Sequence, residues 1–117
     1  MTKDAVAFRW SDLEVDRPMD LLSRRRIIGE KMMLSHIHLD AGCDVPAHRH
    51  ENEQFACVLS GKIRFRLGDD GGHDETLVGG EVLWLPSGVL HSAQAIEDTV
   101  VLDVFSPPSE TTGIDRD

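Results

Sequence analysis

GCDVPAHRHENEQFACVLSG, residues 42–61, holds the pattern from which the rest of this chain can be interpreted. His48 and His50 stand two residues apart, and Gln54 keeps the same parity. Side chains two apart in an extended chain point to the same face, so both imidazoles and the amide oxygen can converge on one point. Imidazole with an oxygen ligand suits a divalent transition metal. An isolated His-x-His more often marks a partly exposed strand edge, so the metal interpretation needs a further ligand.

A second segment, GEVLWLPSGVLH at residues 80–91, supplies that ligand. Gly80, Pro86 and Gly88 predict tight turns around a short strand. His91 then opens the next strand. A third imidazole at this position can close on the same point from the opposite wall, which favours the metal interpretation.

These two segments together resemble the motifs of the cupin family. The first motif is Gly, five residues, His-x-His, three or four residues, Glu, six residues, Gly. Its positions here are Gly42, His48, His50, Gln54 and Gly61. The second is Gly, five residues, Pro-x-Gly, two residues, His, three residues, Asn. Its positions here are Gly80, Pro86, Gly88, His91 and Ala95.

The resemblance implies an all-β chain folded as a double-stranded β-helix, the jelly-roll cupin barrel. It also implies a divalent transition metal inside one mouth, with zinc, nickel, manganese and iron equally open. The implied metal ligands are His48, His50, Gln54 and His91. Gln54 stands where Glu is usual, so the metal would keep more of its positive charge and polarise a bound oxygen more strongly, at a cost in affinity. Ala95 stands where Asn is usual.

A finer resemblance extends to residues 97–108, EDTVVLDVFSPP. With HENEQ, this segment is similar to the pectin-degradation cupins, which open the ring of 4,5-unsaturated galacturonate to a linear keto acid. That subgroup implies Asp103 and Phe105 as active-site residues. Its active-site arginine position is occupied by Ser109 here, although a substrate carboxylate calls for a cationic clamp, usually arginine. Arg64 or Arg66 could supply the cation, but alternation alone does not say which face meets the cavity.

Asp103 also has an argument of its own. It interrupts the apolar run of residues 100–105, where a carboxylate either points into a polar cavity or carries a large desolvation cost. The cavity interpretation makes Asp103 a candidate general acid/base; the alternative is a structural carboxylate bonded to a neighbouring strand or a buried arginine. Phe105 has the same parity and either lines the pocket or packs in the core.

The remaining chain reads as short strands separated by turn signals, which predicts an antiparallel sandwich or barrel. We expect an N-terminal arm at residues 1–23, the cupin barrel at residues 24–108 and a C-terminal tail at residues 109–117 with a frayed end. Trp10 and Leu13 of the arm should pack onto the barrel or a neighbouring subunit. His36-x-His38 repeats the histidine spacing without a matching ligand downstream, so we interpret it as a structural or interface pair.

Composition limits the classes of partner. The chain has 117 residues, enough for one domain, and a formal net charge of −9, which argues against nucleic-acid binding. We expect no membrane association, because no apolar run approaches the length of a span and the first ten residues lack a signal-peptide core. Two cysteines are too few for a disulfide framework and predict reduced thiols in the cytoplasm. The cupin resemblance suggests a homodimer.

Three functions follow from these patterns. The first is a metal-dependent isomerase or lyase that opens or isomerises a small sugar acid or related carbonyl compound, with Asp103 as general acid/base and Phe105 shaping the pocket. The second is an Fe(II) cupin dioxygenase. The third is a non-catalytic cupin that binds a small molecule, in which Asp103 is a ligand contact only.

Overall fold

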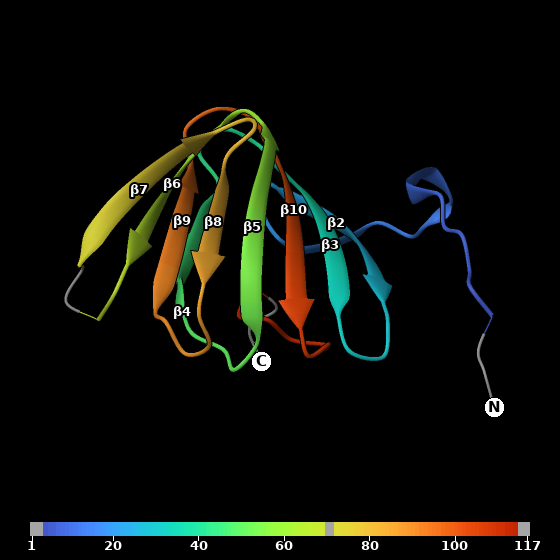
Figure 1. Cartoon of the computed structure of the whole chain (residues 1–117). Helices are drawn as coiled ribbons and strands as arrows, with labels where there is room; N and C mark the ends of the chain where they lie inside the picture. The colour runs from blue at the N-terminus through green and yellow to red at the C-terminus, as the bar shows by residue number, and fades with distance from the viewer. Residues whose placement is uncertain (1–3, 70–71, 115–117) are drawn as a thin grey trace.

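The computed structural model describes residues 4–69 and 72–114, which form two antiparallel sheets facing each other (Figure 1). The elements are η1 (Trp10–Asp12), β1 (Asp16–Met19), β2 (Leu22–Ile28), β3 (Met33–Leu39), β4 (Asp44–His48), β5 (Glu53–Ser60), β6 (Lys62–Leu67), β7 (His73–Val78), β8 (Val82–Leu85), β9 (His91–Ala95) and β10 (Thr99–Ser106). None of the described residues forms a helix long and apolar enough to cross a membrane.

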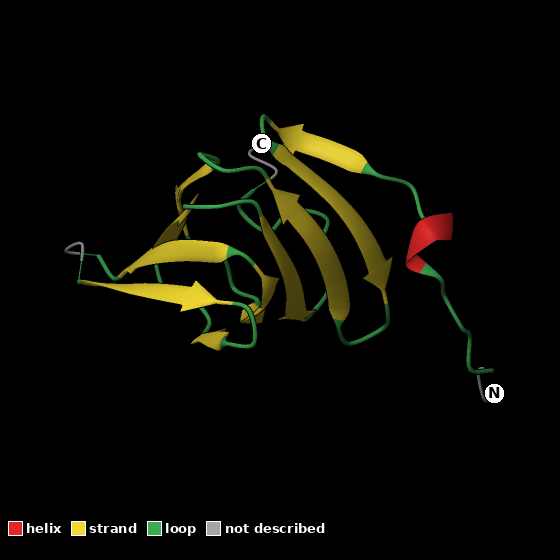
Figure 2. Cartoon of the chain, turned by 90° about the horizontal axis from the view of Figure 1, so that it is seen from above, coloured by secondary structure: helices red, strands yellow, loops and turns green. Residues whose placement is uncertain are grey.

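The large sheet has the order β1-β2-β3-β10-β5-β8, and the small sheet has the order β4-β9-β6-β7. Strands distant in sequence are therefore neighbours, as in a jelly roll. Seen from above, the two sheets form the walls of a cup (Figure 2). This arrangement confirms the all-β double-stranded β-helix predicted from the motifs.

β10 lies in the middle of the large sheet, and its alternating burial pattern follows from this position. It pairs with β3 on one side and β5 on the other. Thr99, Val101, Asp103 and Phe105 point inward and are buried, whereas the residues between them are half-buried on the outer face. Branched side chains fit such a pleated surface with neighbours on both sides. The strand thus places Asp103 and Phe105 inside the cup.

The apolar core fills the space between the inner faces of both sheets. Its members are Leu22, Ile37, Leu39, Cys43, Val45, Ala56, Val58, Ile63, Phe65, Leu67, Leu77, Leu85, Ala95, Val101 and Ile114. Polar side chains on the same inner faces, including Gln54, His91 and Asp103, are also buried. The cup therefore has an apolar floor and a polar region, in which the site lies.

The two ends of the chain differ in how they meet the barrel. Residues 4–15, which precede β1, extend away from it (Figures 1 and 2), but the Trp10 ring lies against His36, with 5.1 Å between ring centroids. At the other end, Thr112 and Ile114 are buried. The polar tail predicted from the sequence therefore packs into the cup up to residue 114; residues 115–117, where fraying was expected, lie outside the described part.

Candidate metal centre

Three histidines from separate segments meet inside the cup. His48 ends β4, His91 begins β9, and these two residues are paired directly across the strands. His50 lies in the loop before β5. The ring centroids are 4.3 Å apart for His48 and His91, and 5.1 Å apart for His50 and His91. One ring nitrogen of each residue lies within 4.8 Å of the others, a spacing suited to a shared metal ion.

Backbone carbonyls fix which nitrogen of each ring faces the centre. The Nδ1 atoms of His48, His50 and His91 lie 2.8, 3.0 and 2.9 Å from the carbonyl oxygens of Pro46, Asn52 and Val89. Because a carbonyl oxygen only accepts, each Nδ1 carries the proton and donates, leaving a lone pair on Nε2. This pattern of support orients histidine ligands in metal sites.

Burial keeps the third histidine in the form that binds metal. Burial lowers the pKa of His91 to about 4, and the nearby imidazoles of His48 and His50 act in the same direction. The ring is therefore neutral at physiological pH, as a metal ligand must be.

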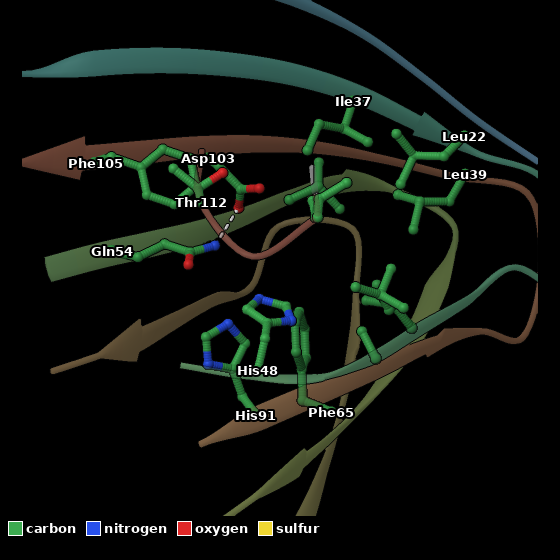
Figure 3. A pocket seen from close by; sticks show the side chains of 15 residues that line it. Leu22, Ile37, Leu39, His48, Gln54, Phe65, His91, Asp103, Phe105 and Thr112 are labelled. Carbon is green, nitrogen blue, oxygen red and sulfur yellow. Dashed lines mark hydrogen bonds between the residues drawn. The ribbon is translucent and has the colours of Figure 1, made fainter. Parts of the chain in front are cut away.

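Gln54 on β5 is oriented by Asp103 on β10. The Gln54 Nε2 donates a hydrogen bond to Asp103 Oδ1 at 2.9 Å, drawn as a dashed line in Figure 3. Because the amide nitrogen is engaged there, the carbonyl oxygen Oε1 turns to the side of the histidines (Figure 3). Neither Gln54 Oε1 nor His50 Nε2, both buried, has a hydrogen-bond partner. A buried atom left without a partner costs about 1–3 kcal/mol, and a cation among these atoms would satisfy both, so the residues fit a metal.

Asp103 is only 5% exposed. Burial raises its pKa to about 7, and the hydrogen bond from Gln54 opposes that rise. Both protonation states are therefore populated near neutral pH, which is the condition for moving a proton in either direction.

The cavity beside these groups has a volume of about 40 Å³. His48, Gln54, His91 and Asp103 supply its polar lining, and Phe65, Val101 and Phe105 are among its apolar lining residues. The Phe105 ring also stands edge-on to the His50 ring, with centroids 5.7 Å apart. Phe105 therefore lines the cavity and packs against a histidine of the centre at once.

The structure brings together the six site residues predicted from the sequence and separates the two arginines offered as clamps. Arg64 and Arg66 lie on the outer face of β6, because Ile63, Phe65 and Leu67 point inward. Arg64 Nη2 donates to Gln94 Oε1 at 2.8 Å, and Arg66 Nε to Asp74 Oδ1 at 3.1 Å. Neither arginine reaches the cavity.

Ser109, at the subgroup's arginine position, forms a local turn instead. Its hydroxyl donates to the carbonyl of Thr111 and accepts from the Thr111 N–H. Sequence reasoning missed two features nearby: Thr112 and Ile114 line the cavity, and Arg26 lies beside the same segment. The polar composition of the tail gives no signal of the first, and the basic run of residues 24–26 does not by itself indicate which arginine meets the tail.

Comparison with known proteins agrees with the fold. A cupin domain model matches residues 35–105. The chain is similar to KdgF from a Halomonas species, with 24% identity, a TM-score of 0.83 and coverage of 92% of this chain and 97% of that chain. The chain is also similar to an RmlC-like cupin from Shewanella frigidimarina, with 23% identity and a TM-score of 0.81. That match covers 92% of this chain and 95% of the other chain.

The chain also resembles part of a larger protein, an oxalate decarboxylase with Mn(II) centres from Bacillus subtilis. The identity is 24% and the TM-score 0.80, covering 94% of this chain and 33% of the decarboxylase. No curated protein matches the chain significantly. At these identities, the likeness to solved structures shows the fold.

Proposed function

The chain belongs to the cupin family, and on that premise we propose that it is a metal-dependent enzyme that opens or isomerises a small sugar acid or a related carbonyl compound. One observation carries the proposal: the amide of Gln54 bonds a buried carboxyl group, Asp103, on one side and turns its oxygen to three histidines on the other. A metal position and a proton-transfer group are thereby held next to each other.

His48, His50, Gln54 and His91 would hold a divalent transition metal such as zinc, nickel, manganese or iron. Such an ion supplies Lewis acidity to a substrate oxygen. The chain's own residues do the rest. Asp103 takes the proton from the anomeric hydroxyl as the ring opens and returns it to carbon as the keto form appears, so no net proton is consumed. Phe105 and the apolar wall exclude water from the reacting face.

The choice of a sugar acid is supported by the subgroup-like segments HENEQ and EDTVVLDVFSPP and by the similarity to KdgF. A carboxyl group whose pKa burial raises to about 7 suits an isomerisation, in which one group must accept and then donate. The neutral amide ligand suits it too, because it leaves the ion's charge available to a substrate oxygen.

The test is turnover of 4,5-unsaturated galacturonate by protein loaded separately with each metal, followed as loss of the ultraviolet absorbance of the conjugated enoate. Asp103→Asn should lower kcat roughly 10²–10⁴-fold, the usual contribution of a positioned acid/base. The metal content of the variant should stay unchanged. No turnover of any unsaturated uronate by any metal form would overturn the sugar-acid assignment.

Two other functions can be distinguished with the same preparation. Oxygen uptake by the Fe(II)-loaded protein in the presence of a substrate would identify a dioxygenase. Ligand binding with biological activity untouched in Asp103→Asn would identify a non-catalytic binding cupin.

We also propose that the chain acts as a cytoplasmic homodimer. Cys43 and Cys57 are both free thiols, in keeping with a reducing compartment. The outer face of the large sheet carries a row of apolar side chains paired across five strands: Ile27, Leu34, Val104, Phe55 and Trp84. Phe55 is 44% and Trp84 56% exposed, which favours this face as the dimer contact.

A further inference from the structure

The C-terminal segment, residues 109–114, crosses the cup over the metal centre, and we call it the strap. Thr112 and Ile114 line the cavity, and Figure 3 shows Thr112 beside Asp103 and Phe105. The backbone of Gly113 lies against the His48 ring, so closely that a Cβ there would overlap the ring carbons. With the strap seated, about 40 Å³ of cavity remains. Pockets for small molecules occupy roughly 300–1,000 Å³, so the cavity is too small for a sugar acid while the strap is seated.

Arg26 on β2 holds the strap. Its Nη1 donates a hydrogen bond to the carbonyl oxygen of Glu110 at 3.0 Å. At the entry to the strap, the side-chain amide of Asn52 donates to the carbonyl of Pro107. A carbonyl oxygen carries no net charge, so an anion would be a stronger partner for the guanidinium in the same place.

The sheet register places Arg26 on the same inner face as Asp103. Arg26 pairs with Ser35, and Ser35 pairs with Asp103. Residues directly paired across strands project to one side, and two strand spacings amount to roughly 10 Å. A ligand anion held by Arg26 would therefore lie on the same side of the sheet as the proton-transfer group.

Arg26 shares its acidic neighbour, Asp16, with Arg24. Asp16 is engaged by Arg24, whose Nε and Nη2 donate to its two carboxylate oxygens at 3.0 and 2.7 Å. Arg26 reaches the same carboxylate only at 3.7 Å. Arg24 is 2% exposed, whereas Arg26 is 24% exposed. The chain's net charge of −9 makes such a local cation necessary for an anionic substrate.

We propose that the Arg26 guanidinium binds the substrate carboxylate. In the enzyme without substrate, the carbonyl oxygen of Glu110 in the strap occupies the place of that carboxylate on the guanidinium. The inference rests on the proposed function for the anionic character of the substrate. Substrate and strap then compete for one guanidinium, so the carboxylate that enters also releases the strap. Arg26 would thus supply the cationic clamp for the carboxylate, in place of the subgroup's arginine, whose position is occupied by Ser109 in this chain.

The test compares D-galacturonate with its neutral counterpart galactose, titrated into the metal-loaded full-length protein by calorimetry. The native chain should bind galacturonate at least roughly 10-fold more tightly, as expected for a charge-assisted pair. Arg26→Met should abolish that preference, while Arg64→Met, on the outer face, should keep it. Hydrogen exchange of residues 109–114 should rise with galacturonate and stay unchanged with galactose.

Arg26→Met also separates two roles, because the change loosens the strap. If Arg26 only held the strap, its loss would leave galacturonate binding unchanged or tighter; as the carboxylate clamp, its loss weakens binding. Ile114→Asn, which removes an apolar anchor of the strap, supplies the opposite control and should tighten galacturonate binding. Melting curves and metal content check that each variant is folded.

Failure of this inference can be told from failure of the proposed function. Turnover of unsaturated galacturonate with an unchanged KM in Arg26→Met overturns the role of Arg26 and leaves the function standing. An Arg26-dependent preference for galacturonate without turnover of unsaturated uronates supports Arg26 as the carboxylate-binding residue and refutes the proposed enzymatic function. Equal binding of galacturonate and galactose by the native chain overturns the inference directly.

Discussion

At the scale of single residues, Gln54 and Asp103 make sense only as a pair. The amide donates to the carboxylate at 2.9 Å, and its oxygen is left for the histidine side of the cavity. A carboxylate at position 54 would meet Asp103 as a second anion, and two such groups in contact share a proton rather than both ionise. The departure from the usual Glu therefore leaves Asp103 independent as a proton carrier.

The variant Gln54→Glu tests this pairing. The added charge should strengthen metal binding, whereas the Asp103 carboxyl should lose its donor and its independent titration. We expect metal content at or above the native level and turnover reduced roughly 10–100-fold, a loss of about 1.4–2.7 kcal/mol of transition-state stabilisation. Elemental analysis checks the metal content, and kcat measured on the same preparation checks the turnover. Full activity of the Gln54→Glu variant would show that the amide is dispensable.

The three imidazoles predict a stability change when metal is added. An ion present at 100 times its Kd stabilises the folded chain by about 2.7 kcal/mol, which for a domain of this size raises Tm by about 10 °C. His50→Ala should remove most of the rise. The exposed His73, which lies 3.3 Å from Glu75, provides the control: His73→Ala should keep it. Differential scanning calorimetry with and without a chelator measures the shift, and an equal rise in His50→Ala would contradict the centre.

At the scale of elements, the parity of residues was enough to predict much of the site. Alternation along residues 100–105 placed Asp103 and Phe105 on one face, and both point inward in β10. The same alternation divides the residues of β6 between two faces, but it does not show which face points into the cup, because that depends on the facing sheet. In the structure, Arg64 and Arg66 lie on the outer face. The strap was not predictable, because Ile114 is buried by the cup and not by any local pattern.

The two glycines that frame the first motif give a test at this scale. Gly42 and Gly61 have nearly the same positive φ, 90° and 89°. A Cβ on Gly42 would meet nothing, whereas one on Gly61 would overlap the Asp98 carbonyl and the backbone and hydroxyl of Thr99. Gly42→Ala should cost about 1 kcal/mol of unfolding free energy from strain alone. Gly61→Ala should cost about 3 kcal/mol or more, because the overlap is with backbone.

Urea denaturation of the two glycine variants measures this difference, and each serves as the other's control. Equal losses would mean that backbone conformation alone selects glycine at both places. A larger loss in Gly61→Ala would show that the hairpin from β5 to β6 depends on close packing against the chain that enters β10.

At the scale of the whole molecule, the two sheets present unlike outer faces. The small sheet carries Arg64 and Arg66, bonded to Gln94 and Asp74, and such a polar face is suited to water. The outer face of the large sheet carries the apolar row that ends at Phe55 and Trp84. Monomers seldom expose contiguous apolar patches of this kind. This asymmetry, visible only once the register is known, is the basis of the proposed dimer.

A charge placed in the apolar row should separate the subunits. Phe55→Glu puts a carboxylate at the proposed contact, where burial without a partner costs several kcal/mol per ion; two copies across a symmetric interface repeat the penalty. The native chain should have about twice the 13.0 kDa mass of one chain by light scattering, and Phe55→Glu about one. Arg64→Glu, on the other sheet, should leave the mass unchanged. Because position 55 points out of the cup, metal content should be the same in all three proteins, and a native mass of one chain would refute the dimer.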